Sequence, residues 1–170
     1  MTLSYEAKLV SGVSLLAVPT VMFGGWTLLG LLTQGTAGSD PGGLTLDETQ
    51  RALWRAGHAH AGVWLILSLV IQVLLDSARL SSALKWLARI SAPVAAVAMS
   101  GGFFGLAFLP GFRWLLYLGV LSMVVAVALS GVGLLRNLRT HTGDTQRVGS
   151  AGHIAAASRP PGHGSSEALD

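Results

Sequence analysis

The chain has no cysteine and few charged residues, and these two shortages narrow its possible chemistry. Without cysteine there can be no disulfide, no thiolate metal site, no iron–sulfur cluster and no haem attached through a CxxCH motif. Charged residues make up only 11% of the 170 residues, against about 25% in soluble domains, and 51% of the chain is hydrophobic. The composition therefore indicates a membrane protein. Its net charge of +3 is explained by membrane topology, so nucleic acid is not an expected partner.

Catalytic patterns that depend on paired polar groups are also missing. The sequence has no facing carboxylates, no nucleophile–base pair and no glycine-rich phosphate loop. Hydrolase, kinase and ATPase chemistry is therefore not expected.

Four long segments without charged residues predict four membrane-spanning helices. They cover about residues 9–33, 56–75, 90–109 and 114–135. About 20 apolar residues in a helix cross a hydrocarbon core roughly 30 Å thick. The first segment is too long for a signal peptide, whose apolar core is about 7–15 residues. The lipid bilayer is thus the first expected partner.

These spans predict an all-α fold, an integral membrane four-helix bundle within residues 1–136. Residues 137–170 are polar, basic at first and rich in Gly, Ser and Pro. Such a composition cannot bury enough apolar surface to fold. We therefore expect a disordered C-terminal tail after the bundle.

Lysine and arginine residues in the short flanks of the spans predict the orientation. The side that holds both termini has Lys8, Arg79, Lys85, Arg89, Arg136, Arg139 and Arg147. The opposite side has only Arg51, Arg55 and Arg113. We therefore expect a multi-pass protein of a bacterial plasma membrane, with both termini in the cytoplasm.

Local signals place the polar residues of the spans. Thr45 and Glu48 have the spacing of a capping box, which predicts that the second helix begins near Leu46. Gln72, the amide in the middle of the second span, is expected to hydrogen-bond to a neighbouring helix. The GxxxG pattern that ends at Gly105 indicates close helix packing.

The most chemically distinctive stretch is Trp54–Gly62, which puts His58 and His60 at the mouth of the second span. A histidine at the edge of a bilayer is a functional-site hypothesis by default. Residues two apart on a helix point about 200° apart, so the two imidazoles cannot share one ion. A shared zinc or copper ion is therefore disfavoured, since a zinc pair has i, i+4 spacing.

One histidine beside a planar cofactor fits the stretch better. Haem iron needs a single proximal imidazole and flat surface next to it. Ala61 and Gly62 could provide that surface for His58, and Ala56 and Gly57 could provide it for His60. Aromatic walls and propionate partners are available in Trp54, Trp64, Phe103, Phe104, Arg51 and Arg55. Structural histidines and arginines that only extend to the interface are an equally good interpretation.

These residues resemble a known family, the small haem-containing membrane isomerases typified by styrene oxide isomerase. Trp54, Arg55-Ala56 and the run Ala59-His60-Ala61-Gly62 are similar to the Trp, Arg-Ala-His and Gly run around that family's haem-ligating histidine. Gly102-Phe103-Phe104 is similar to its Gly-Phe-Tyr. The spacing from the tryptophan favours His58 as the ligand, and the Ala-His-x-Gly pattern favours His60.

The resemblance implies a homotrimer with haem b held between protomers. Ferric iron would act as a Lewis acid and rearrange a small apolar epoxide to an aldehyde by a Meinwald rearrangement, with His58 or His60 as the catalytic ligand. Two polar groups of the family are missing. Its Asn, about six residues after the ligand, corresponds to Trp64 or Ile66, and its pocket Tyr corresponds to Phe103 or Phe104. Haem binding therefore carries over better than isomerase activity.

Two other functions remain possible from the sequence. A haem protein that transfers electrons or senses a gas could have the same ligand, and a second axial ligand would favour it. A membrane accessory protein without a cofactor would have histidines with a structural role only.

Overall fold

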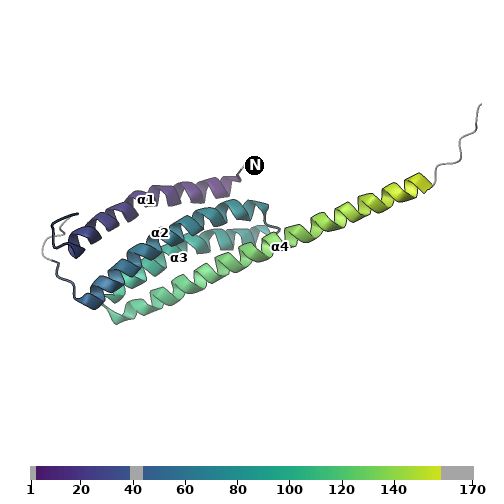
Figure 1. The fold of residues 1–170 in the computed structure, drawn as a ribbon. Coiled ribbons are helices and arrows are strands. Elements are labelled where there is room, and N and C mark those ends of the chain that lie inside the picture. The colour runs from purple at the N-terminus through teal and green to yellow at the C-terminus, as the bar shows by residue number, and fades with distance from the viewer. Residues whose placement is uncertain (1–2, 39–43, 158–170) are drawn as a thin grey trace, which may run out of the picture.

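Four long helices make up the described part of the chain. The computed structural model describes the backbone of residues 3–38 and 44–157, and the side chains of residues 3–38 and 44–138. The elements are α1 (Tyr5–Leu32), α2 (Glu48–Ser77), α3 (Ser82–Leu106), the short 3₁₀ helix η1 (Pro110–Phe112) and α4 (Arg113–Ala157) (Figure 1). Each of the four long helices is apolar enough to cross a membrane. The predicted all-α fold with four spans is confirmed.

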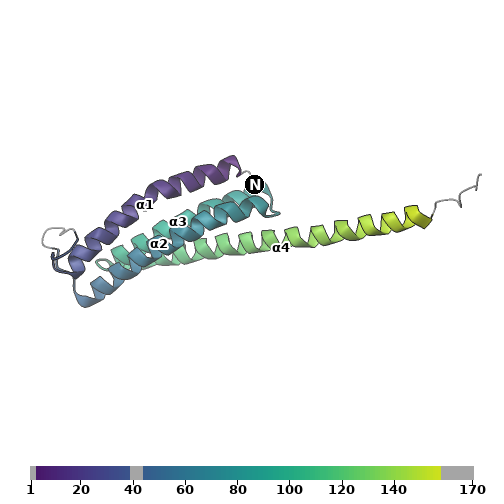
Figure 2. The same cartoon turned by 45° about the horizontal axis from the view of Figure 1, so that its top comes forward.

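The helices α2, α3 and α4 run side by side, and α1 lies along α2 (Figure 1, Figure 2). Helix α3 is central, because it packs against both α2 and α4 and buries the largest share of its residues. Helix α1 buries the smallest share. The side chains between α1 and α2 are therefore the least tightly enclosed of the bundle.

Helices α3 and α4 approach closely because glycines lie at their contact. A Cβ on Gly119 would lie 2.8 Å from the backbone nitrogen of Met99, closer than real Cβ atoms come. A Cβ on Gly102 would lie 3.0 Å from the backbone nitrogen of Leu116 in α4, and a Cβ on Gly105 would overlap the ring of Phe112 in η1. Of the predicted GxxxG pair, Gly105 is thus closely packed, whereas a Cβ on Gly101 would make an ordinary contact with Leu115 at 3.5 Å.

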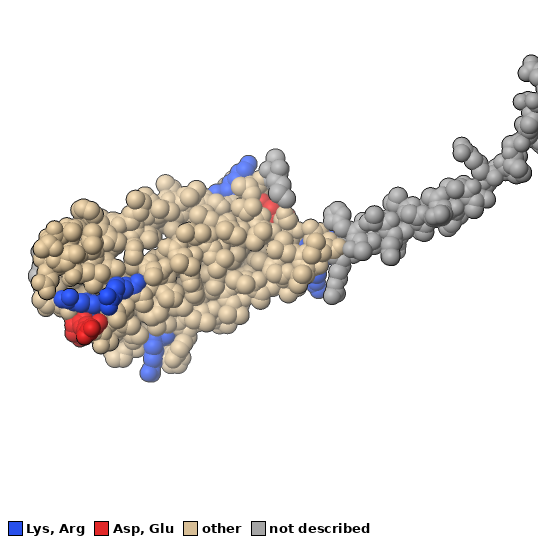
Figure 3. All heavy atoms as spheres, viewed as in Figure 1, with Lys and Arg blue, Asp and Glu red and all other residues tan. Residues whose placement is uncertain are grey.

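The charged side chains lie near the two ends of the bundle on the face that Figure 3 shows, and an uncharged surface separates them. Large apolar side chains such as Leu16, Val97 and Leu121 are exposed along the helices. Apolar surface of this extent indicates contact with a membrane. The chain is therefore a multi-pass membrane protein.

The predicted fourth span lies within α4, whose helical backbone continues to Ala157. The predicted tail begins at residue 137, inside this helix. Its side chains from residue 139 onward, and its backbone from residue 158 onward, lie outside the described residues. The disorder of the tail therefore stays a prediction.

Helix α2 begins two residues later than the sequence predicts, at Glu48. The capping box is formed by Asp47 and Gln50, and the predicted box of Thr45 and Glu48 is wrong. A tertiary contact explains the difference. The Gln50 side chain also donates a hydrogen bond of 2.9 Å to the carbonyl of Ala107, which connects α2 to the end of α3. The prediction that both histidines lie on continuous helix is confirmed.

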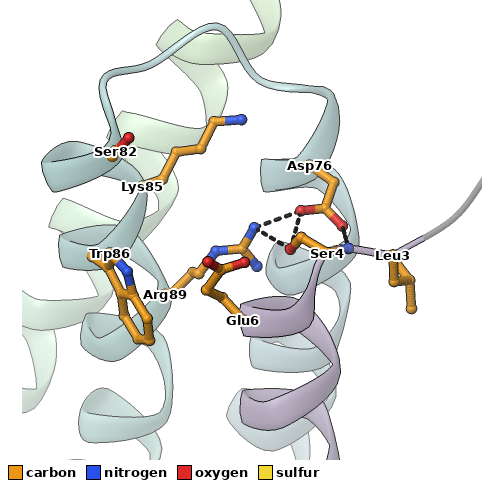
Figure 4. Close-up of a pocket in the computed structure, with 8 residues that line it drawn as sticks. All are labelled: Leu3, Ser4, Glu6, Asp76, Ser82, Lys85, Trp86 and Arg89. Carbon is orange, nitrogen blue, oxygen red and sulfur yellow. Dashed lines mark hydrogen bonds and ion pairs between the residues drawn. The ribbon is translucent and has the colours of Figure 1, made fainter.

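A buried arginine joins three helices at the opposite end of α2 (Figure 4). Arg89 of α3 has 3% of its surface exposed, although the sequence places it in the charged flank of the third span. Its guanidinium donates a hydrogen bond of 2.5 Å to the carboxylate of Asp76 in α2. It donates another, of 3.1 Å, to the hydroxyl of Ser4, which caps α1. The main chain and side chain of Ser4 both donate to the same carboxylate, at 2.9 and 2.7 Å.

Gln72 completes this network and confirms the hydrogen bond predicted for it. The Gln72 side chain donates a hydrogen bond of 3.1 Å to the carbonyl of Arg89. The Arg89 guanidinium donates hydrogen bonds of 3.3 Å to the main-chain and side-chain oxygens of Gln72. A buried charge is tolerated when it is paired and hydrogen-bonded in this way. The Ser4–Gln72–Asp76–Arg89 network therefore fixes the ends of α1, α2 and α3 to one another.

We expect Arg89→Met to lower the free energy of unfolding by about 3 kcal/mol, because removing one partner of a buried pair leaves the other unmatched. Thermal unfolding in one mild detergent would measure the loss. Arg79→Met, at an exposed arginine of the neighbouring connection, should change stability by less than about 0.5 kcal/mol. Equal effects of the two substitutions would contradict the structural role of the network.

Candidate functional site

The two histidines of α2 lie on opposite sides of its exposed stripe. Ala59, between them, is exposed, and both imidazoles are half-buried. The ring of His58 lies against α1, near Gly24 and Gly25, whereas the ring of His60 contacts Phe103 of α3. This divergence is what helix geometry predicts for residues two apart.

His58 occupies a gap between α1 and α2 that a glycine makes possible. A Cβ on Gly25 would lie 2.9 Å from Cε1 and 3.0 Å from Nε2 of His58. Beside the ring is an apolar pocket of about 230 Å³ lined by Val18, Val21, Met22, Gly25, His58, Gly62, Leu65 and Ile66. Within the described part of the chain, the imidazole has no hydrogen-bond partner. Its ring nitrogens are therefore not committed to another side chain or carbonyl of the described residues.

Two arginines lie on the same face of α2 as His58, toward the start of the helix. Arg51, Arg55, His58 and Gly62 follow each other at intervals of three or four residues, which places them on one side. A second cavity of about 570 Å³ is lined by Leu32, Leu46, Glu48, Arg51 and Arg55. Nε of Arg51 donates a hydrogen bond of 2.9 Å to the carbonyl of Leu46, which fixes the position of the side chain. This face thus has an apolar part at His58 and a cationic part at the helix start.

The second imidazole has a different environment. Nδ1 of His60 lies 2.7 Å from the carbonyl of Ala56, one turn earlier. Its ring centroid is 4.8 Å from that of Phe103 and 5.8 Å from that of Trp64. A carbonyl only accepts, so the bond requires a proton on Nδ1. The ring is therefore held by its own helix and by aromatic neighbours.

The other predicted aromatic residues form a third group near the start of α2. The ring of Trp54 packs edge-on against Phe104, at 5.4 Å between centroids, and against Phe108, at 6.1 Å. A Cβ on Gly57 would lie 3.2 Å from atoms of Phe103 and Phe104, so this glycine lets α2 and α3 meet. The indole nitrogen of Trp54 is buried and has no partner among the described residues.

The predicted site is therefore divided. The structure brings His58, Arg51, Arg55 and Gly62 to the α1 side of α2, and it brings His60, Trp64 and Phe103 together on the α3 side. Trp54 and Phe104 pair with each other and touch neither histidine in any ring contact of the described residues. No group of three His, Asp or Glu side chains that could hold a metal ion occurs within residues 3–38 and 44–138.

Sequence reasoning missed two features. The Gly24-Gly25 pair of α1, which makes room for His58, could have been noticed as two adjacent glycines in the first span. The network around Arg89 could have been noticed from Gln72 and Asp76, which are one helical turn apart and precede a short connection.

Comparisons with known proteins leave the resemblance as an expectation: no family model, no curated protein and no solved structure matches the chain.

Gly25→Ala tests how tightly His58 is seated. The added methyl group would meet the imidazole, so we expect a loss of stability of about 1–3 kcal/mol from overpacking. Gly12→Ala is the matched control on the same helix, since a Cβ there meets nothing within 4 Å. That control should be neutral or stabilising by up to about 1 kcal/mol, because alanine favours helix. Equal thermal unfolding of the two variants would contradict the close seating of His58.

Proposed function

We propose that this membrane protein binds haem b through His58, on the α1 side of α2. The observation that carries the proposal is the position of the imidazole, which lies beside an apolar pocket and on the same helix face as Arg51 and Arg55. Haem b has the same polarity pattern, an iron that takes one axial imidazole, an apolar macrocycle and two carboxylates at one edge. One face of α2 therefore has a cationic part at Arg51 and Arg55, followed by the ligand His58 and its apolar pocket, which matches the polarity of haem b.

His58 is a better ligand candidate than His60 because its ring nitrogens are uncommitted within residues 3–38 and 44–138. His60 uses Nδ1 for the carbonyl of Ala56 and packs its ring against Phe103 and Trp64. Those contacts satisfy a structural role. Since the rings diverge, one iron cannot take both as axial ligands within a protomer, which weighs against a bis-histidine electron carrier made by one chain.

The space at His58 limits how a porphyrin could lie. The pocket of about 230 Å³ is below the roughly 300–1,000 Å³ of most ligand pockets. Open space continues beside Gly62, where a Cβ would meet no atom within 4 Å. The macrocycle would therefore extend outward past Gly62, and a second protomer could cover it, as the resemblance to the trimeric isomerases implies.

The reaction we propose is the rearrangement of a small apolar epoxide to an aldehyde, by resemblance to styrene oxide isomerase. When bound, the ferric haem supplies Lewis acidity toward the epoxide oxygen. Val18, Met22 and Leu65 give the pocket an apolar lining, which would favour rearrangement over hydrolysis by water. Apart from His58, the residues that line this pocket are glycines and apolar side chains, so substrate would be oriented by shape and apolar contact.

His58→Ala should abolish the Soret band of protein that is purified in mild detergent after expression with added haem. His60→Ala should keep the band, because its ring already has structural partners. Visible spectra of oxidised and reduced protein measure both results. A band lost only in His60→Ala would overturn the assignment of His58, and no band in the unsubstituted protein would overturn haem binding altogether.

Activity is a separate prediction. The ferric protein should convert styrene oxide to phenylacetaldehyde, and His58→Ala should reduce the rate to that of haem alone. Gas chromatography of the product measures the conversion. Haem binding without any conversion would contradict the isomerase and would favour electron transfer or gas sensing, and a protein without haem would favour an accessory role.

A further inference from the structure

The end of the bundle opposite the histidines holds a polar pocket that the proposed function does not use. It has a volume of about 390 Å³ and lies between the starts of α1 and α3 and the end of α2 (Figure 4). Its walls include the paired side chains of Asp76 and Arg89 and the charged side chains of Glu6 and Lys85. Trp86 forms one side.

The charges in this pocket are only half satisfied. Asp76 and Arg89 form an ion pair and neutralise each other. Glu6 and Lys85 form no ion pair or side-chain hydrogen bond with any residue of the described chain, although both line the pocket. The pocket therefore offers one unmatched anion and one unmatched cation. Its net charge is zero, which suits a zwitterion better than a simple anion.

An apolar groove lies farther along α3, where this helix faces Leu115 and Leu118 of α4. It has a volume of about 500 Å³, and its walls include Ile90, Pro93 and Val97. Trp86 lines the pocket, and these three residues follow it at intervals of four, three and four, so they form one stripe of the helix. From Trp86 to Val97 the helix rises about 16 Å, close to half of a hydrocarbon core about 30 Å thick. This stripe of α3 thus extends over the depth of about one leaflet.

We propose that this surface binds one phospholipid with a zwitterionic ethanolamine headgroup. The phosphate lies toward Lys85 and the first turn of α3, whose N–H groups favour an anion. The ammonium lies toward the carboxylate of Glu6, to which it can donate hydrogen bonds. An acyl chain follows the groove past Trp86 to Val97. Charge complementarity in the polar pocket, together with the apolar stripe of α3 that leads from Trp86 to the groove, selects this occupant over a free phosphate or a soluble zwitterion.

Native mass spectrometry of the delipidated protein in detergent tests the proposal with phosphatidylethanolamine and phosphatidylglycerol of identical acyl chains. One phosphatidylethanolamine should be retained in preference to phosphatidylglycerol. Lys85→Gln should reduce its retention about tenfold, the value of one charge-assisted hydrogen bond. Glu6→Gln should lower the preference for ethanolamine over glycerol about tenfold, since it removes the partner of the ammonium and the repulsion of an anionic lipid.

Two controls separate this site from the general lipid shell. Lys8→Gln removes the same charge from an exposed lysine of α1 that does not line the pocket, and it should leave retention unchanged. Val97→Trp fills the groove without changing any charge, and it should reduce retention of both lipids. Thermal unfolding confirms that each variant is folded.

Three results would overturn the proposal. Equal retention of the two lipids by the unsubstituted protein would remove the role of the unmatched charges. Equal effects of Lys85→Gln and Lys8→Gln would reduce the contact to general surface charge. Competition by glycerophosphoethanolamine at the same concentration as the lipid would show that the acyl groove contributes nothing.

Discussion

The charge of Arg89 is the constraint on which the arrangement of the helices depends. A guanidinium inside an apolar bundle is stable only where acceptors surround it, and here two neighbouring helices supply them. Asp76 and Gln72 come from α2, and Ser4 comes from the cap of α1. The same contact therefore sets the level at which three helices begin or end, and it gives α1, the least buried helix, a specific attachment.

Helix α2 links this contact to the candidate site. Its C-terminal part carries the acceptors for Arg89, and its N-terminal part carries the two imidazoles. Because the helix is continuous, the depth of the histidines in the membrane follows from the position of Asp76 and Gln72 at the far end. The two ends differ in chemistry. At one end Asp76 and Gln72 are hydrogen-bonded within the chain, and at the other an imidazole and two arginines face cavities.

The spans could be predicted from the sequence because long uncharged segments have few alternatives in a membrane. The opposite directions of His58 and His60 also follow from helical periodicity alone. What could not be predicted is which neighbour each ring meets, since the Gly24-Gly25 pair and Phe103 reach α2 only through tertiary packing. The capping box of Asp47 and the burial of Arg89 were missed for the same reason, because their partners on other helices decide both.

Ser4 attaches the N-terminal end of α1 to Asp76 and Arg89, so a change in the tilt of α1 would be largest at its far end. Gly25 lies 21 residues beyond Ser4, which is about 32 Å along a helix. A tilt of roughly 2° about the attached end therefore displaces the glycine by about 1 Å. A displacement of that size is comparable to the clearance between Gly25 and the imidazole, where a single methyl group already has no room. The packing around His58 is therefore sensitive to the angle of α1, which the contacts of Ser4 help to set at the other end of the bundle.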